Sequence, residues 1–94
     1  MIPRDLDDVL EALANKHRRE MVYVLGLQPM AISQLAAMRD LSLPAIHKHV
    51  KVLEAAGLIR REIRWRTHVC HLDPGPLARA HEWLRHYERF WTDR

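Results

Sequence analysis

One face of a short segment in the middle of the chain carries side chains suited to binding a polyanion. At about 100° per residue, a helix over 42–56 places Pro44, His47, Lys48 and Lys51 on one side. Its opposite side is apolar and comprises Leu43, Ile46, Val50 and Leu53. A helical face with two lysines, an imidazole and no acid suits phosphates and base edges in a DNA major groove. The alternative is a solvated helix surface.

A second cationic group follows closely in the sequence. Arg64 and Arg66 stand in the turn between two expected strands, where they could lie along a minor groove or contact phosphates. The segment 39–66 holds seven bases against three acids, whereas the formal charge of the whole chain is only +3. Positive charge concentrated in one segment points to a polyanionic partner. An exposed turn with unrelated charges is the alternative, and the shared sign of the two arginines argues against it.

Histidine, cysteine and acidic residues occur in two groups, but neither has the spacing of a metal site. His68 and Cys70 would share one face of a strand while His71 lies on the other, too few ligands for structural zinc. In the last helix, His81 and His86 are five residues apart rather than the three or four that align ligands. We therefore expect no metal and no cofactor.

Cys70 is the one cysteine, so no internal disulfide can form. A redox switch would need exposure and an activating cation such as Arg60 or Arg61, and a packed, inert thiol is the better interpretation. His49 lies toward the apolar side of its helix, which favours a partly buried, hydrogen-bonded ring over a base reader. Because no nucleophile motif, glycine-rich phosphate loop or paired carboxylates occur, we expect no enzyme.

Positioning these residues requires a compact set of elements. We expect helices over 5–14, 16–25, 32–38 and 42–56, a very short strand at 30–31, strands over 58–63 and 68–72, and a last helix over 77–92. Asn15 and Ser42 are natural N-caps, and Gly57 is the glycine that ends the fourth helix. The sequence Gly26 to Pro29 is expected to break the second helix. The bases of 16–19 are either a phosphate contact or a solvated cluster.

Both ends of the chain carry more apolar surface than one small domain can cover. The first helix has the stripe Leu6, Val9, Leu10 and Leu13, and the last helix has the stripe Leu77, Ala80, Leu84, Tyr87 and Trp91. A second copy of the chain could cover this apolar surface. The two copies of the helix over 42–56, related by a two-fold axis, would then contact the two halves of a palindromic DNA site. The alternative is that these aromatic residues cover the protomer's own core.

Length and composition predict one globular domain over residues 1–94. No apolar run approaches the roughly 20 residues that span a bilayer, and the N-terminus turns acidic at Asp5 instead of opening a signal peptide. We therefore expect a cytoplasmic protein with no membrane contact.

The order of the elements is that of a winged helix-turn-helix, mainly α with a small β-hairpin. The stretches LANKHRR, LSLPAIHKHVKVLEAAGLI and HLDPGPL resemble the ArsR-type family of bacterial transcriptional regulators. The ending WLRHYERFW is similar to a branch whose members respond to something other than a bound metal. The resemblance covers nearly the whole chain.

This resemblance implies a homodimeric repressor that binds operator DNA near its own promoter and releases it on a signal. The positions that match its recognition helix are Ser42, Pro44, Ala45, His47, Lys48 and Lys51, and those that match its wing are Arg60, Arg64 and Arg66. Its first and last helices form the dimer interface. The sequence departs from the family at His47, usually serine, and at Trp65, where a glycine commonly makes the turn. The rival function is a winged-helix module for protein contacts or for binding DNA without sequence preference.

Overall fold

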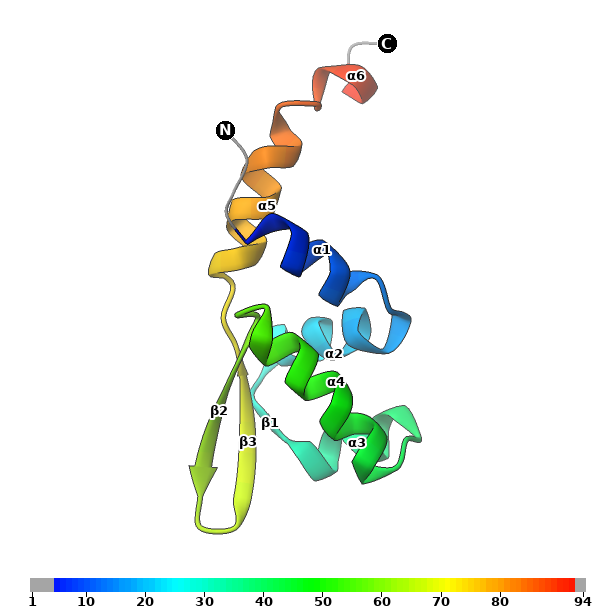
Figure 1. The fold of residues 1–94 in the computed structure, drawn as a ribbon, viewed down its shortest axis with the longest axis vertical. Coiled ribbons are helices and arrows are strands. Elements are labelled where there is room, and N and C mark those ends of the chain that lie inside the picture. The colour runs from blue at the N-terminus through cyan, green and yellow to red at the C-terminus, as the bar shows by residue number, and fades with distance from the viewer. Residues whose placement is uncertain (1–4, 93–94) are drawn as a thin grey trace.

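A computed structural model describes residues 5–92, and its elements follow the predicted order (Figure 1). In chain order they are α1 (Leu6–Leu13), α2 (Lys16–Leu27), β1 (Met30–Ala31), α3 (Ile32–Arg39), α4 (Leu43–Ala55), β2 (Ile59–Arg64), β3 (Thr67–Leu72), α5 (Gly75–Arg85) and α6 (Arg89–Thr92). The mainly helical winged helix-turn-helix architecture is therefore confirmed.

Local sequence signals set the helix ends around the helix-turn-helix. The Asn15 side chain accepts a hydrogen bond from the Arg18 amide at 3.1 Å, and the Ser42 hydroxyl accepts one from the Ala45 amide at 3.3 Å. Gly57 adopts φ 76°, and its amide donates to the carbonyl of Glu54 at 2.9 Å. This left-handed conformation ends α4 and is tolerated best by glycine. All three predicted caps are confirmed.

Two helix ends differ from the sequence-based expectation. α2 runs through Gly26 to Leu27, and it ends because Pro29 forces the preceding Gln28 into an extended conformation with ψ 153°. The last helix is not continuous, since α5 ends at Arg85 and the turn 86–88 separates it from α6. The amides of this turn bond three residues back, which is a tighter winding than the α-helix.

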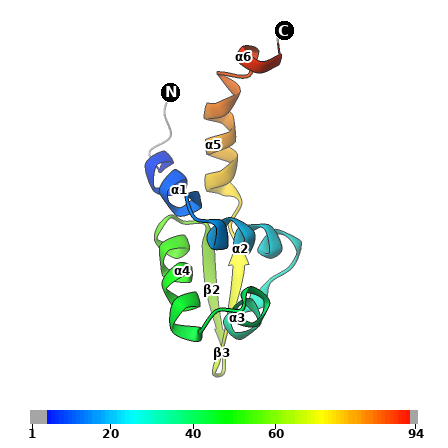
Figure 2. The same cartoon turned by 90° about the vertical axis from the view of Figure 1, so that its right-hand side faces the viewer.

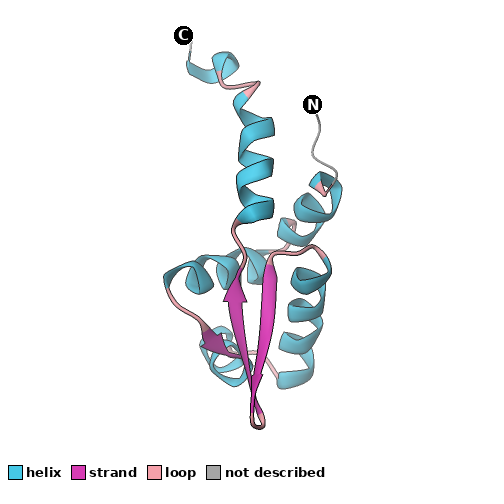
Figure 3. Cartoon of the chain, turned by 90° about the vertical axis from the view of Figure 1, so that its left-hand side faces the viewer, coloured by secondary structure: helices cyan, strands magenta, loops and turns pink. Residues whose placement is uncertain are grey.

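The sheet has the strand order β1-β3-β2 and is antiparallel throughout (Figure 3). Arg64 pairs with Thr67, so the hairpin β2–β3 closes through only Trp65 and Arg66. Its inner face carries Cys70, which β1 also contacts through the pairing of Met30 with Cys70. We call this hairpin the wing.

The core lies between the helices and the inner face of the wing. Its largest fully buried side chains are Met21, Leu35, Ile46, Leu53, Leu58, Val9, Val50 and Cys70. Leu6 and Val9 of α1 belong to it, so this part of the expected dimer stripe packs inside the protomer. Leu43 is also placed differently from the prediction, because it is 50% exposed rather than buried with Ile46.

The molecule is elongated, with extents of 50 × 24 × 21 Å. Helices α5 and α6 project from one end, whereas the wing tip, α3 and the start of α4 lie at the other (Figure 2). The residues predicted for DNA contact and the C-terminal helices predicted for dimerisation thus lie toward opposite ends of the molecule.

Candidate nucleic-acid interface

Helix α4 presents its cationic face because its other face is anchored in the core. Ile46, Val50 and Leu53 are fully buried, and the 100° spacing therefore directs Lys48 and Lys51 into solvent. No ion pair within residues 5–92 involves either lysine. Of the other recognition-helix positions, Ser42 and Pro44 are exposed and Ala45 and His47 are half-buried.

A groove separates the start of α4 from the wing. It has a volume of about 340 Å³, and its lining residues are Ala31, Ile32, Ser33, Leu43, His47, Arg66, Thr67 and His68. Ala31 of β1 and the start of α3 line it as well, so four parts of the fold, β1, α3, α4 and the wing, meet here. His47 and Arg66 come from opposite sides, which brings two predicted DNA-binding residues to one site. Sequence reasoning did not place Ser33, Thr67 and His68 at this groove, although the hairpin register alone would have placed Thr67 beside the tip.

The wing arginines do not act as one group. Arg64 pairs with Glu62 at 3.1 Å, and His71 also contacts this carboxylate at 2.9 Å. These hydrogen bonds, from His71 first and then Arg64, lower the pKa of Glu62. Arg66 is exposed at the tip, whereas Arg60 is exposed near the opposite end of β2. At about 3.3 Å per residue, Arg60 lies roughly 17 Å along the strand from Trp65.

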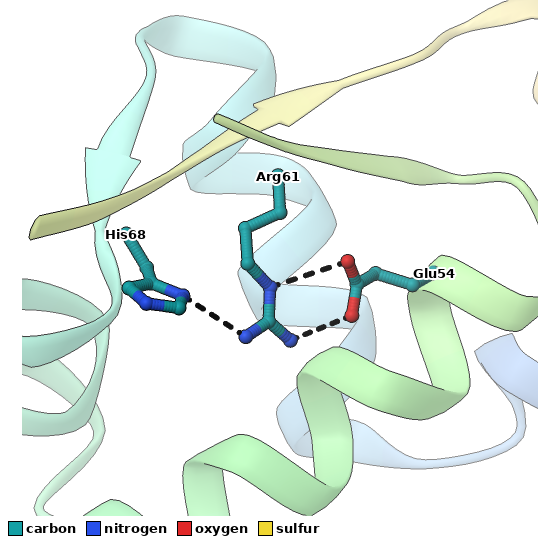
Figure 4. Close-up of polar contacts among 3 residues, drawn as sticks. All are labelled: Glu54, Arg61 and His68. Carbon is teal, nitrogen blue, oxygen red and sulfur yellow. Dashed lines mark hydrogen bonds and ion pairs between the residues drawn. The ribbon is translucent and has the colours of Figure 1, made fainter. Parts of the chain in front are cut away.

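A polar network ties the wing to the end of α4 (Figure 4). Arg61 donates two hydrogen bonds to Glu54, from Nε at 3.2 Å and from Nη2 at 2.6 Å. Its Nη1 donates to His68 Nδ1 at 3.1 Å. The bidentate geometry limits rotation of both side chains. Arg61 therefore links the wing to α4, and its guanidinium group is engaged within the protomer.

The bases at the start of α2 have a structural role. Arg18 Nε donates to the carbonyl of Ala12 at 2.6 Å, and Arg19 Nη1 donates to that of Leu13 at 3.0 Å. Both carbonyls belong to the last turn of α1, where cations are favourable. These two arginines thus cap α1, a role not predicted from the sequence, while Lys16 and Arg19 remain exposed as in a solvated cluster.

His49 is partly buried and hydrogen-bonded, as predicted. Its Nδ1 accepts from Arg18 Nη1 at 3.4 Å, and its ring lies 5.6 Å from that of His17. Burial, followed by the nearby charges of Arg18 and His17, lowers the pKa of His49. His17 in turn accepts from Arg39, which also pairs with Glu20.

Cys70 is fully buried on the inner face of the wing, as predicted. Burial raises the pKa of its thiol despite the opposing charge of Arg61, so little thiolate forms. His68 shares this inner face, while His71 lies on the outer face beside Glu62. Within residues 5–92, no three His, Cys, Asp or Glu side chains are grouped closely enough to hold a metal ion.

The residues expected at a dimer interface fall into two classes. Leu6 and Val9 are buried in the protomer, and Leu13 and Leu77 are partly buried against its core. The other four, Leu10, Leu84, Tyr87 and Trp91, are exposed, and so is Phe90, which was not among the expected residues. Tyr87, in the turn between α5 and α6, packs against Trp83 at 5.2 Å and against Phe90 at 6.1 Å between ring centroids. An apolar surface thus remains open at the C-terminal end.

Comparisons with known proteins agree with this architecture. Residues 13–62 match the helix-turn-helix domain family. The chain is 37% identical over 89 residues to the HTH-type transcriptional regulator Rv2034 of Mycobacterium tuberculosis, covering 95% of this chain and 80% of that protein. The crystal structure of the ArsR family transcriptional regulator RHA00566 is similar with a TM-score of 0.86 and 31% identity, covering 100% and 97% of the two chains. The chain belongs to the ArsR family.

A second solved ArsR-like regulator, from Rhodococcus sp. RHA1, has a TM-score of 0.79 and 28% identity over 96% of this chain and 85% of that one. This ArsR family chain is therefore a transcriptional regulator with a helix-turn-helix DNA-binding domain, and its relatives are regulators rather than enzymes. None of the helices in the described part of the chain has the length and apolarity to cross a membrane.

Proposed function

We propose that this ArsR family chain is a homodimeric repressor that binds a palindromic operator. The observation that carries the proposal is the exposed face of α4, on which Lys48 and Lys51 have no ionic partner within residues 5–92. Unpaired cations on a helix anchored by buried apolar residues favour insertion into the major groove. A protein bound to an operator within a promoter sterically excludes the transcription machinery, so binding alone represses the gene.

The groove beside α4 supports a docking arrangement. With α4 in the major groove, the wing follows into the adjacent minor groove, and one sugar–phosphate strand passes between them. The groove offers Ser33, Thr67 and His68 to that strand. His68 Nδ1 accepts from Arg61, so its proton is on Nε2, which can donate to a phosphate oxygen.

The recognition contacts divide into two kinds. Ser42, Pro44, Ala45 and His47 lie at the start of α4, where side chains of a recognition helix approach base edges. Lys48, Lys51, Arg64 and Arg66 supply charge for phosphates and, at the wing, for the minor groove. Arg60 belongs to the proposal only as a peripheral phosphate contact, because it lies far from the tip.

Dimerisation through the C-terminal helices completes the proposal. Leu84 of α5, Tyr87 of the turn 86–88, and Phe90 and Trp91 of α6 are exposed, and Leu10 is exposed on α1, which contacts α5. Burying such a surface against a second copy is favourable by roughly 25 cal/mol per Å². A two-fold axis there would hold two α4 helices for half-sites about one helical turn, roughly 34 Å, apart.

A fluorescence-anisotropy titration against the DNA upstream of its own gene tests the proposal. The titration is run beside scrambled competitor, with added zinc and with a chelator. Saturable binding that survives competitor and ignores metal supports the repressor. Binding with no preference over competitor supports instead a winged-helix module for non-specific DNA or protein contacts. Binding that depends on zinc would contradict the absence of a metal cofactor.

A further inference from the structure

Trp65 at the tip of the wing has no structural task within the described chain. Its side chain is 98% exposed, more than any other large apolar residue of residues 5–92. No aromatic or cation–π pair among these residues involves its ring. Its φ of 60° lies in the left-handed region, which a residue with a Cβ atom adopts at a cost. The two-residue turn would therefore be better served by glycine.

The neighbours of Trp65 indicate which partner would cover it. Arg64 precedes it and Arg66 follows it, and both residues are exposed, although Arg64 also pairs with Glu62. Arg66 also lines the groove that the wing shares with the start of α4. The tip lies at the same end of the molecule as α3 and the start of α4 (Figures 1 and 2). An apolar ring between two cations complements a polyanion that also has apolar surface, and duplex DNA is such a partner.

We propose that Trp65 is an apolar DNA contact of the wing, and this inference rests on the proposed function. With Arg64 and Arg66 on the phosphates at either side, the indole enters the minor groove and packs against sugars and base edges. Proteins that place large apolar side chains there partly unstack one base step. Flexible pyrimidine–purine steps unstack at the lowest cost, so Trp65 also favours operators with such a step at the wing.

The variant Trp65→Gly tests this inference without damaging the fold. Glycine accepts φ 60° freely, so the melting temperature should stay the same or rise. Operator affinity, measured by anisotropy at several salt concentrations, should fall roughly tenfold for each lost base–aromatic contact, hence about 100-fold for a dimer that loses two. The slope of log K against log salt should stay unchanged because no phosphate contact is lost.

Two matched variants give the result its meaning. Trp65→Phe keeps an apolar ring and should retain most of the affinity. Arg66→Ala removes a neighbouring charge, so each protomer of a dimer loses one phosphate contact. Each contact contributes about 0.9 to the slope of log K against log salt, and the slope should therefore fall by about 1.8.

Two outcomes would overturn the inference. Wild-type affinity in Trp65→Gly, while the wild type still prefers operator over competitor, removes the Trp65 contact and leaves the proposed function intact. A wild type with no such preference removes both.

Discussion

Replacing Lys48 or Lys51 by alanine tests the recognition face most directly. Each lysine is exposed and has no ionic partner within residues 5–92, so its removal breaks no internal contact. One lost phosphate contact lowers the salt slope by about 0.9, and a homodimer loses two contacts per substitution, giving about 1.8. Because the counterion effect vanishes near 1 M salt, this corresponds to about a 30-fold loss of affinity at 0.15 M.

The assay is operator binding by anisotropy between about 0.05 and 0.5 M salt, with dimer mass and thermal stability measured in parallel. Lys48→Arg is the control, because it keeps the charge and should keep the slope. Both alanine variants should remain folded dimers. If both retain the wild-type affinity and slope, α4 does not face the phosphates, and the assignment of the recognition helix is wrong.

Three further predictions concern the interface, pH and the helix ends. Leu84→Glu should convert the dimer to a folded monomer in light scattering, because Leu84 is 44% exposed; Leu27→Glu, at a 70% exposed site on α2, should leave the mass unchanged, and the reverse pattern would refute the C-terminal interface. Since burial lowers the pKa of His49, its contribution to stability should be full above pH 6.5 and lost as the pH falls through the folded-state pKa. The free energy of unfolding, measured with urea at a series of pH values, should therefore fall in this range for the wild type and fall less for His49→Gln. The same pH dependence in both proteins would contradict the assignment. Gly57→Ala should destabilise the protein by about 1–2 kcal/mol because alanine is strained at a φ of 76°. A steric clash does not contribute, because the added carbon meets its nearest neighbour at an ordinary 3.6 Å. Gly26→Ala, inside α2 with a nearest contact of 3.5 Å, should instead stabilise by roughly 0.5–1 kcal/mol in the same assay, and equal signs would refute the distinction.

Much of the fold follows from local signals that the sequence displays. Asn15, Ser42 and Gly57 act within three or four residues of their own position, so their caps could be predicted without knowledge of the tertiary structure. The amphipathic stripe of α4 was right at Ile46 and Val50 for the same reason. The spacing of apolar residues predicts which side chains share a helix face, and the capping residues and terminal charges predict where the helix begins and ends.

The errors concern contacts between elements. Periodicity placed Leu43 with the buried stripe, but the first turn of α4 extends beyond the core, and Leu43 lines the groove instead. The stripe of α1 was read as surface for a second copy, yet Leu6 and Val9 lie in the protomer's own core, where α1 contacts α2, α4 and α5. A hydrophobic stripe predicts that a face is covered, and it does not say by which partner.

The number of bases in a segment likewise does not say how many of them are free to bind phosphates, and this number sets the salt dependence of DNA binding. Three of the seven bases in 39–66 are engaged inside the protomer, Arg39 with Glu20, Arg61 with Glu54 and Arg64 with Glu62. The bases of this segment without an ionic partner among residues 5–92 are Lys48, Lys51, Arg60 and Arg66. Counterion release depends on cations that reach phosphates, so the salt slope should reflect these four and Arg64, whose exposed pair with Glu62 can exchange for a phosphate, rather than all seven. The paired Arg61 acts differently, because its contact with Glu54 holds the wing at the distance from α4 that lets Arg66 and His47 line one groove.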